Sequence, residues 1–445
     1  MAIQLYNTLK QKKEALKPRP GKKLQLFVCG PTVYDDSHIG HARTYVAFDT
    51  IVRYLRYRGL KVFYLQNITD IDDKIISRAR EKRTSWKELS RKYTTAYFRD
   101  MKALKIISVD KYAPATKYID AIQKQVKTLL KKGYAYKLKD GIYFDVSKFK
   151  DYGKLSGRTA EQAEDAVSRI DKSIGKRNRA DFALWKYSKP GEPKWESEFG
   201  AGRPGWHIED TAITETEFGP QYDIHGGARD LIFPHHEAEI AQMEAASGKK
   251  PLVRYWLHTG FLNVEGKKMS KSLKNFVTIR DALGKWDVDV IRLMFASTHY
   301  RSPTDYSEAA IKQAKENLDY IRTAIKSGKK KADTKKWTDK FVKIMDDDFN
   351  TPKVIALLLE IAKKMNKSKE NLSPVIYEAG KVLGIDFKPR KEKALPSEIT
   401  KLIKKREKLR KEKKWKESDK IRAELREKGI ILEDKESGTR WRWEK

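Results

Sequence analysis

Cysteine is almost absent from this chain, since Cys29 is the only one among 445 residues. An internal disulfide is therefore excluded, and a reducing compartment is expected. The sequence also lacks an apolar run long enough to span a membrane, and its first 17 residues carry no apolar signal core. Together these absences predict a cytoplasmic protein that has no membrane anchor.

Acidic residues are outnumbered, because 95 Lys and Arg residues accompany only 61 Asp and Glu residues and leave a net charge of +34. An excess of this size favours a polyanionic partner such as a nucleic acid. A solvated lysine-rich surface would give the same count, so charge alone leaves both interpretations open. The length predicts two to four domains.

Residues 24–68 carry the pattern of a parallel α/β unit. Residues 24–28 form a short apolar run that ends at a Gly-Pro pair, as a buried strand does. Residues 39–58 repeat apolar side chains at helical spacing, and residues 60–68 are apolar and rich in β-formers. Strand, helix and strand in this order predict a Rossmann-like doubly wound parallel sheet. The candidate N-caps of the helix are Asp35, Asp36 and Ser37.

The remaining sequence divides by pattern and composition. A very basic helix is expected at residues 397–428, with Ser397 as its N-cap, and a strand at residues 430–432. The expected divisions are the first half of the nucleotide-binding sheet at 1–105, an insertion at 106–200, the second half of the sheet at 201–265, a linker domain at 266–306, a helical bundle at 307–390, and a small basic α+β domain at 394–445.

Two short boxes suggest chemistry on a nucleotide. The box His38-Ile39-Gly40-His41 falls at the start of the predicted helix, where the two imidazoles share a face and can donate to phosphate oxygens. The box Lys268-Met269-Ser270-Lys271-Ser272 offers two ammonium groups to a pyrophosphate that gains charge as it leaves. Taken alone, the first box is better explained by two surface histidines beside a helix cap, and a solvated lysine loop is a serious alternative for the second. Both in this order favour transfer of AMP from ATP to a carboxylate.

The two boxes resemble the signature sequences of class I aminoacyl-tRNA synthetases, and four longer motifs narrow the resemblance. These motifs lie at residues 27–34, 66–74, 202–209 and 233–240, and they resemble the cysteinyl-tRNA synthetase family over nearly the whole chain. The resemblance implies ATP-dependent activation of L-cysteine to cysteinyl-adenylate, with Mg²⁺ accompanying ATP, and transfer of the cysteine to tRNA(Cys). A monomer is the expected assembly.

The same resemblance implies the residues of the site. The family binds Zn²⁺ through two cysteines, a histidine and a glutamate, which correspond here to Cys29, Asp210, His235 and Glu239. The implied catalytic residues are His38, His41, Lys268 and Lys271. The implied ATP site consists of these four together with Gly30, Gly40, His225, Gly226 and Gly227, of which the last three fit a nucleotide-facing turn after a strand. The implied amino-acid pocket consists of Cys29, Gly30, Thr69 and Trp206.

Asp210 departs from the family pattern, in which a second cysteine is usual. Three outcomes are open: zinc is retained with Asp210 as an oxygen ligand, the metal is lost, or the amino-acid specificity has changed. We favour retention of zinc, because carboxylate and thiolate carry the same charge and their distances to zinc differ by only a few tenths of an ångström.

The basic C-terminal end resembles the part of the family that binds the anticodon. The lysines of residues 401–411 can contact phosphates, and Trp441 and Trp443 can stack on unpaired bases, although a solvated helix with docked tryptophans fits equally well. Two other functions remain open. A paralogous cysteine ligase acting on a non-tRNA acceptor is disfavoured by this basic end, and a nucleic-acid-binding protein with an inactive synthetase core is disfavoured by the two intact boxes.

Overall fold

The computed structural model describes residues 2–19, 22–158, 175–269, 273, 275–390, 396–435 and 438–443. The chain forms two compact units, Met1–Lys388 and Pro389–Lys445. Within the described residues, no helix combines the length and the apolar character needed to cross a membrane.

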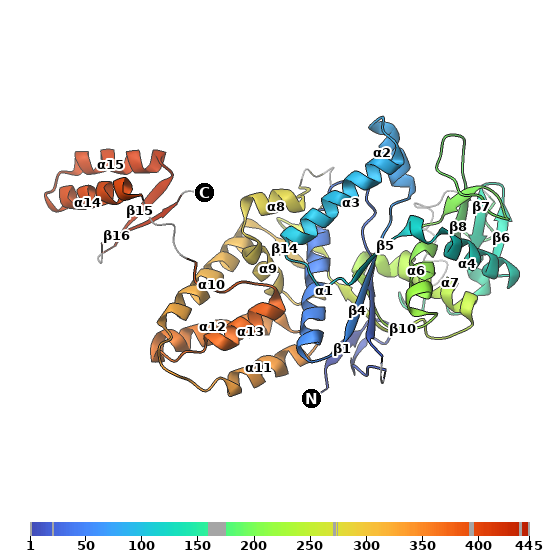
Figure 1. The fold of residues 1–445 in the computed structure, drawn as a ribbon, viewed down its shortest axis with the longest axis horizontal. Coiled ribbons are helices and arrows are strands. Elements are labelled where there is room, and N and C mark those ends of the chain that lie inside the picture. The colour runs from blue at the N-terminus through green and yellow to red at the C-terminus, as the bar shows by residue number, and fades with distance from the viewer. Residues whose placement is uncertain are drawn as a thin grey trace. The chain divides into compact units, whose positions relative to one another are not determined.

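A five-stranded parallel sheet forms the centre of the first unit, in the strand order β11-β10-β3-β4-β5 (Figure 1). The strand order reverses between β3 and β10, and open α/β sheets bind their ligands beyond the carboxyl ends of the strands at such a point. The predicted doubly wound sheet is therefore confirmed. Its strands are β3 (Leu24–Val28), β4 (Val62–Ile68), β5 (Lys111–Pro114), β10 (Tyr222–Ala228) and β11 (Val253–Thr259).

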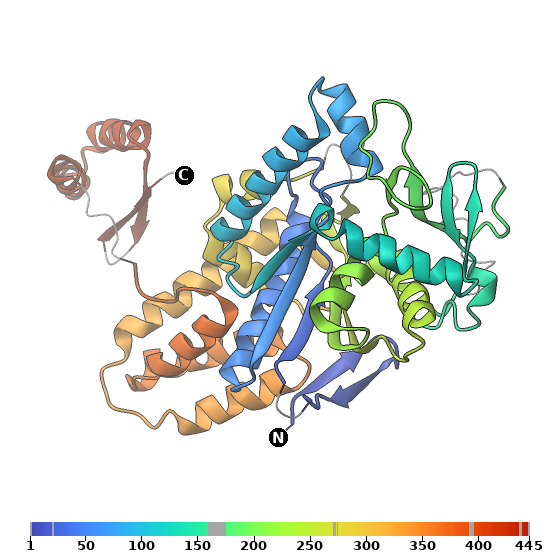
Figure 2. The ribbon, with the colours of Figure 1, turned by 45° about the vertical axis from the view of Figure 1, so that its right-hand side comes forward.

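Helices cover both faces of this sheet, with α1 on one face and α6 and α7 on the other (Figure 2). Strand β3 feeds both cores because side chains alternate along a strand. Leu26 and Val28 enter the core that includes α1, whereas Phe27 and Cys29 enter the core that includes α4, α6 and α7. Cys29 therefore faces α6 and α7. The helices are α1 (Ile39–Tyr57), α4 (Ile119–Lys131), α6 (Ile208–Phe218) and α7 (Glu237–Ser247).

The N-cap of α1 differs from the prediction. His38 caps the helix: its imidazole accepts a hydrogen bond from the backbone N–H of His41, and the ring of His41 accepts one from the backbone N–H of His38. Asp35 instead binds Arg78, and the backbone carbonyl of Ser37 accepts a hydrogen bond from Ile279. A ring nitrogen thus takes the place of the expected carboxylate or hydroxyl oxygen.

Further elements surround the sheet. A four-stranded antiparallel sheet in the order β6-β7-β8-β9 takes its first three strands from the predicted insertion, whereas β9 lies just beyond the predicted boundary at residue 200. A small sheet in the order β13-β12-β14 follows β11. These strands are β6 (Ala135–Leu138), β7 (Gly141–Phe144), β8 (Phe182–Tyr187), β9 (Gly202–Pro204), β12 (Leu262–Val264), β13 (Lys267–Lys268) and β14 (Thr304–Tyr306). An N-terminal hairpin consists of β1 (Gln4–Asn7) and β2 (Lys12–Ala15).

The predicted helical bundle follows β14, and a buried arginine links one of its helices to α1. Arg292 on α9 donates to the Asp49 carboxylate of α1 at 2.7 Å and to the backbone carbonyl of Leu383 on α13 at 2.9 Å. The remaining helices are α2 (Asp73–Glu81), α3 (Trp86–Ala103), α8 (Ile279–Lys285), α9 (Val288–Ala296), α10 (Glu308–Ser327), α11 (Lys335–Asp346), α12 (Thr351–Ser368) and α13 (Ser373–Leu383).

The second unit has two helices and a hairpin around its own small core. The prediction of a single helix at residues 397–428 is wrong. The chain turns at Lys413, whose φ of 59° is left-handed, and two helices form instead. Ser397 is the first helical residue and not the N-cap, which is Pro396. Buried Arg406 donates two hydrogen bonds to the Asp434 carboxylate, at 2.7 and 2.8 Å. The elements are α14 (Ser397–Lys411), α15 (Trp415–Glu427), β15 (Ile430–Lys435) and β16 (Gly438–Trp443).

Candidate functional site

The structure brings the four predicted zinc ligands together around Cys29, at the carboxyl end of β3. The Cys29 Sγ lies 3.4 Å from Asp210 Oδ2 and 3.8 Å from Glu239 Oε1. The His235 Nε2 lies 3.0 Å from Asp210 Oδ2 and 3.0 Å from Glu239 Oε1. All four side chains are buried, and one ligand atom from each lies within 4.8 Å of every other. This spacing fits a single metal ion.

Local structure explains how distant residues meet here. Asp210 lies in the first turn of α6, and Glu239 lies in the first turn of α7. His235 precedes Glu239 by one helical turn, so the two side chains point to the same side. Because α6 and α7 pack against each other on the face that Cys29 enters, the three elements converge at the switch point of the sheet.

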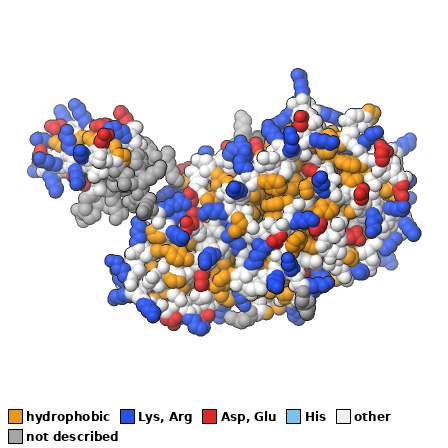
Figure 3. Space-filling model, viewed as in Figure 1, with side chains coloured by type: hydrophobic (Ala, Val, Ile, Leu, Met, Phe, Trp, Pro, Cys, Tyr) orange, Lys and Arg blue, Asp and Glu red, His pale blue; other side chains and the backbone are white. Residues whose placement is uncertain are grey.

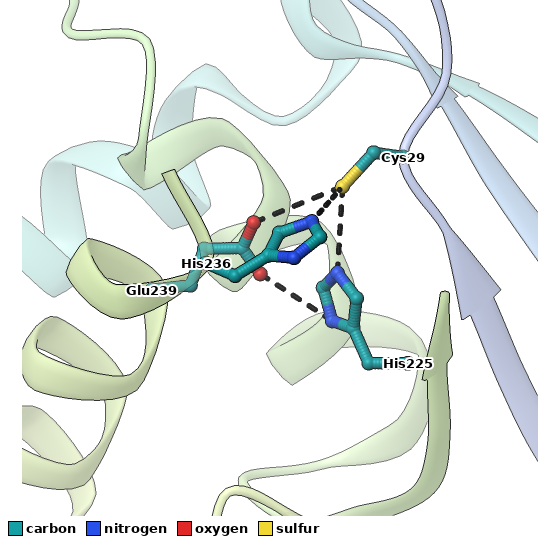
Figure 4. Close-up of side chains that lie close together, drawn as sticks. All are labelled: Cys29, His225, His236 and Glu239. Carbon is teal, nitrogen blue, oxygen red and sulfur yellow. Dashed lines mark hydrogen bonds and ion pairs between the residues drawn. The ribbon is translucent and has the colours of Figure 1, made fainter. Parts of the chain in front are cut away.

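Two further histidines lie beside the same sulfur. The Cys29 Sγ is 3.4 Å from the Nε2 of His225 and 3.1 Å from the Nε2 of His236 (Figure 4). The sequence prediction placed His225 with the nucleotide and gave His236 no role, although His236 lies in the same motif as His235. Its position next to a predicted ligand was the only sequence signal that it could face the metal.

The segment His225-Gly226-Gly227 lies inside strand β10, whereas a turn after a strand was predicted. Both glycines allow close packing. A Cβ on Gly226 would lie 2.3 Å from the ring of Phe48, and one on Gly227 would lie 2.7 Å from Cε1 of His236. The glycine pair thus gives room to α1 and to His236. Its contact with ATP stays a prediction.

The electrostatics of the group suit a cation. Burial, together with the charges of Glu239 and Asp210, raises the pKa of the Cys29 thiol well above its usual value. Burial lowers the pKa of His235, but the two carboxylates outweigh it and raise that pKa to about 10. The Oδ1 atom of Asp210 is buried and has no hydrogen-bond partner among the described residues. Clustered buried acidic groups of this kind need a positive partner, which the protonated His235 ring supplies without a metal and which a bound cation would supply in its place.

Residues of the predicted amino-acid pocket lie next to this group or to its neighbours. The Trp206 indole stacks on the His235 ring, with centroids 4.4 Å apart. The Thr69 hydroxyl donates to Glu209 Oε2 at 3.0 Å, so a buried carboxylate that the sequence prediction missed lies beside the pocket. Gly30 packs so closely on strand β4 that a Cβ there would lie 1.8 Å from the backbone oxygen of Asn67.

The two boxes lie near each other in the structure. The rings of His38 and His41 stack with centroids 3.7 Å apart, and burial together with the charge of His38 lowers the pKa of His41 well below its usual value. The Cε atom of Met269 would lie 3.6 Å from a Cβ built on Gly40, so Met269, at the start of the second box, lies against the first box. Lys268 is exposed on β13. Lys271 lies outside the described residues.

The sheet with its reversed strand order and the two sequence boxes that accompany it identify a class I aminoacyl-tRNA synthetase. Solved structures agree on the fold: methionyl-tRNA synthetase from Mycobacterium tuberculosis in complex with methionyl-adenylate has a TM-score of 0.60 at 16% identity, covering 81% of this chain and 89% of that one. A structure of the ternary complex of Agrobacterium radiobacter K84 agnB2 LeuRS-tRNA-LeuAMS has a TM-score of 0.59 at 11% identity, covering 82% and 84%.

The sequence comparisons identify the family. Residues 15–316 match the tRNA synthetases class I (C) catalytic domain, residues 340–388 the DALR domain, and residues 392–442 the cysteinyl-tRNA ligase anticodon binding domain. A cysteine–tRNA ligase from Thermococcus gammatolerans is 47% identical over 476 residues, covering 99% of both chains. One from Thermoplasma volcanium is 44% identical, covering 98% of this chain and 99% of that one. The chain therefore belongs to the cysteinyl-tRNA synthetase family and is a ligase.

Proposed function

We propose that this protein joins L-cysteine to tRNA(Cys) in two steps. The cysteine carboxylate attacks the α-phosphate of ATP and pyrophosphate leaves, which gives cysteinyl-adenylate. A hydroxyl of the terminal tRNA ribose then attacks the carbonyl carbon and AMP leaves. The observation that carries this proposal is the buried group of Cys29, Asp210, His235 and Glu239 at the switch point of a class I synthetase sheet.

The residues of this group fit Zn²⁺. They offer one sulfur, one nitrogen and two oxygen donors, all of which are known zinc ligands. The unpartnered Oδ1 of Asp210 adds a second reason to expect a cation. When bound, zinc would supply selectivity for cysteine over serine, since a thiolate is a much better zinc ligand than an alcohol. Shape alone separates such near-isosteres by only about 1–3 kcal/mol.

ATP is assigned to residues of the two boxes, and the amino acid to residues beside the zinc ligands. His38 and His41 lie stacked at the N-terminus of α1, where ring N–H groups can donate to phosphate oxygens and the helix dipole favours negative charge. Lys268 and Lys271 are proposed to neutralise the departing pyrophosphate. Mg²⁺ is proposed to enter the site bound to ATP. Trp206 and Thr69 are proposed to border the amino acid.

The tRNA is proposed to bind through the basic surface and the second unit. Lys and Arg side chains are scattered over the visible face of the first unit, with fewer acidic side chains between them (Figure 3). Lysines along α14 are exposed and can contact phosphates. The side chains of Trp441 and Trp443 lie outside the described residues, so their stacking stays a prediction. The sequence divisions given above are proposed as the functional domains.

The test is charging of tRNA by the full chain. Metal-loaded protein is incubated with ATP, L-cysteine and either tRNA(Cys) or, as a matched control, a tRNA for serine. We expect cysteine to be esterified to tRNA(Cys) alone. Activation of cysteine without esterification, together with transfer to an amino sugar, would support the paralogous ligase instead. Absence of activation in folded, metal-loaded protein would support an inactive core.

A further inference from the structure

The buried group around Cys29 contains two overlapping sets of four possible ligands. One is the predicted set with Asp210 and His235. The other replaces these two residues with His225 and His236, and its four ligand atoms also lie within 4.8 Å of one another. Figure 4 shows this second set, with the His225 and His236 rings both directed at the sulfur. Cys29 and Glu239 belong to both sets.

Both histidines of the second set are held with one nitrogen toward the sulfur. The Nδ1 of His225 is hydrogen-bonded to the Tyr222 hydroxyl at 2.6 Å. The Nδ1 of His236 is hydrogen-bonded to the Nε2 of His258 at 2.8 Å, and His258 is hydrogen-bonded in turn to Thr8 Oγ1 at 2.8 Å. A metal-binding histidine characteristically has its outer nitrogen held in this way, which fixes the ring orientation.

Two of the three separations from the sulfur in the second set match those of a metal cage, and the third, to His236 Nε2, is shorter by a few tenths of an ångström. The Cys29 sulfur lies 3.4 Å and 3.1 Å from the two Nε2 atoms and 3.8 Å from Glu239 Oε1. Ligand atoms about 2.0–2.3 Å from a tetrahedral zinc ion lie about 3.3–3.8 Å from one another. The set therefore needs little rearrangement to enclose an ion.

The donor chemistry favours the second set when no substrate is bound. It gives zinc one thiolate, two imidazoles and one carboxylate, and the complex is neutral. The first set gives one thiolate, one imidazole and two carboxylates, which leaves a net charge of −1 in a buried place. Zinc prefers nitrogen and sulfur donors to carboxylate oxygen, and burial disfavours uncompensated charge. A substrate thiolate would supply the first set with the sulfur that Asp210 does not provide, and the ammonium group of the same substrate would balance the negative charge that this thiolate adds.

We propose that Cys29, His225, His236 and Glu239 form a second metal cage, and that it holds the divalent ion in the enzyme free of cysteine. The two cages share two ligands, so only one is filled at a time. Binding of cysteine shifts the ion to Asp210 and His235, where the substrate sulfur completes its coordination. This inference rests on the proposed function for the role of the first cage only.

The test is X-ray absorption spectroscopy of the zinc-loaded full chain without ATP or tRNA, because imidazole rings give an outer-shell signal that can be counted. Without cysteine we expect one sulfur and two imidazoles around the ion. With saturating cysteine we expect two sulfurs and one imidazole. A single imidazole in the cysteine-free protein would overturn the proposal. Two imidazoles in a protein that fails to charge tRNA would uphold the cage and reject the proposed function.

A matched pair of variants separates the cages by affinity. Asp210→Asn alters only the first cage, and His236→Gln alters only the second. In the absence of cysteine we expect His236→Gln to weaken zinc binding at least tenfold and Asp210→Asn to change it less than threefold, measured by competition with a zinc chelator. The opposite order would contradict the proposal. Thermal unfolding of the metal-free variants checks their folding, and the spectroscopy of the unaltered chain decides the question if either fails to fold.

Discussion

Replacement of Cys29 by serine tests the metal site most broadly, because this sulfur belongs to both cages. The sulfur lies between 3.1 and 3.8 Å from ligand atoms of four neighbouring side chains. Serine retains the position of the ligand, and zinc–oxygen distances are only slightly shorter than zinc–sulfur distances. The loss is therefore one of ligand chemistry, since a serine hydroxyl is neutral and a poor zinc ligand.

We expect zinc affinity to fall at least about 100-fold, which corresponds to about 2.7 kcal/mol. The weaker binding should also appear as lost stability. Zinc at 100 times its Kd stabilises the folded chain by about 2.7 kcal/mol, and after a 100-fold loss of affinity the same zinc concentration stabilises Cys29→Ser by only about 0.4 kcal/mol. Chelator competition measures the affinity, and denaturant unfolding with and without zinc measures the stability.

A control for this experiment is possible because the chain has a single cysteine. Because Cys29 is the only thiol, protection by zinc against a thiol reagent reports on one position in the unaltered chain. Cys29→Ala serves as a second variant that removes the ligand atom altogether. A folded Cys29→Ser protein that binds zinc within threefold of the unaltered chain would refute the reasoning.

Three further changes have defined outcomes. Gly30→Ala would place a Cβ 1.8 Å from the Asn67 oxygen, so it should cost about 2–3 kcal/mol in denaturant unfolding, and an unchanged free energy would contradict the packing. His41→Asn should slow ATP–pyrophosphate exchange about 100-fold or more with zinc content unchanged, and equal loss of zinc would argue against a separate ATP role. The Arg406 guanidinium lowers the pKa of Asp434 to about 2, so this pair stabilises the second unit above pH 4 and the contribution is lost as the pH falls through about 2. Asp434→Asn should therefore cost about 1 kcal/mol at pH 7 but little at pH 2, as measured by denaturant unfolding, and a pH-independent difference would contradict the assignment.

The central elements of the fold could be predicted from local pattern. The run at residues 24–28 is apolar because β3 is covered on both faces, and the helical spacing after His38 matches α1, which is buried on most sides. The resemblance to the family gave the four predicted zinc ligands, because Cys29, His235 and Glu239 lie in long motifs and Asp210 directly follows one. In these places local pattern and tertiary environment agree.

The unpredicted features depend on contacts between distant segments. His225 was assigned to a turn, but pairing of β10 with both β3 and β11 makes its segment a strand and aims its ring at Cys29. No spacing rule gives that register. The break at Lys413 was missed because the helix ends there without glycine or proline, through a left-handed lysine. The histidine N-cap was missed because the usual capping residues lie just before it and bind elsewhere.

The central claim is that a caged metal ion selects the thiol of the amino acid that this synthetase activates. The most direct measurement is ATP–pyrophosphate exchange with cysteine and serine side by side, using metal-free and zinc-loaded full chain. We predict rapid exchange with cysteine only when zinc is bound, and serine slower by at least about 1,000-fold, which exceeds what shape alone provides. Equal rates with the two amino acids, or cysteine exchange that is the same without zinc, would contradict the account.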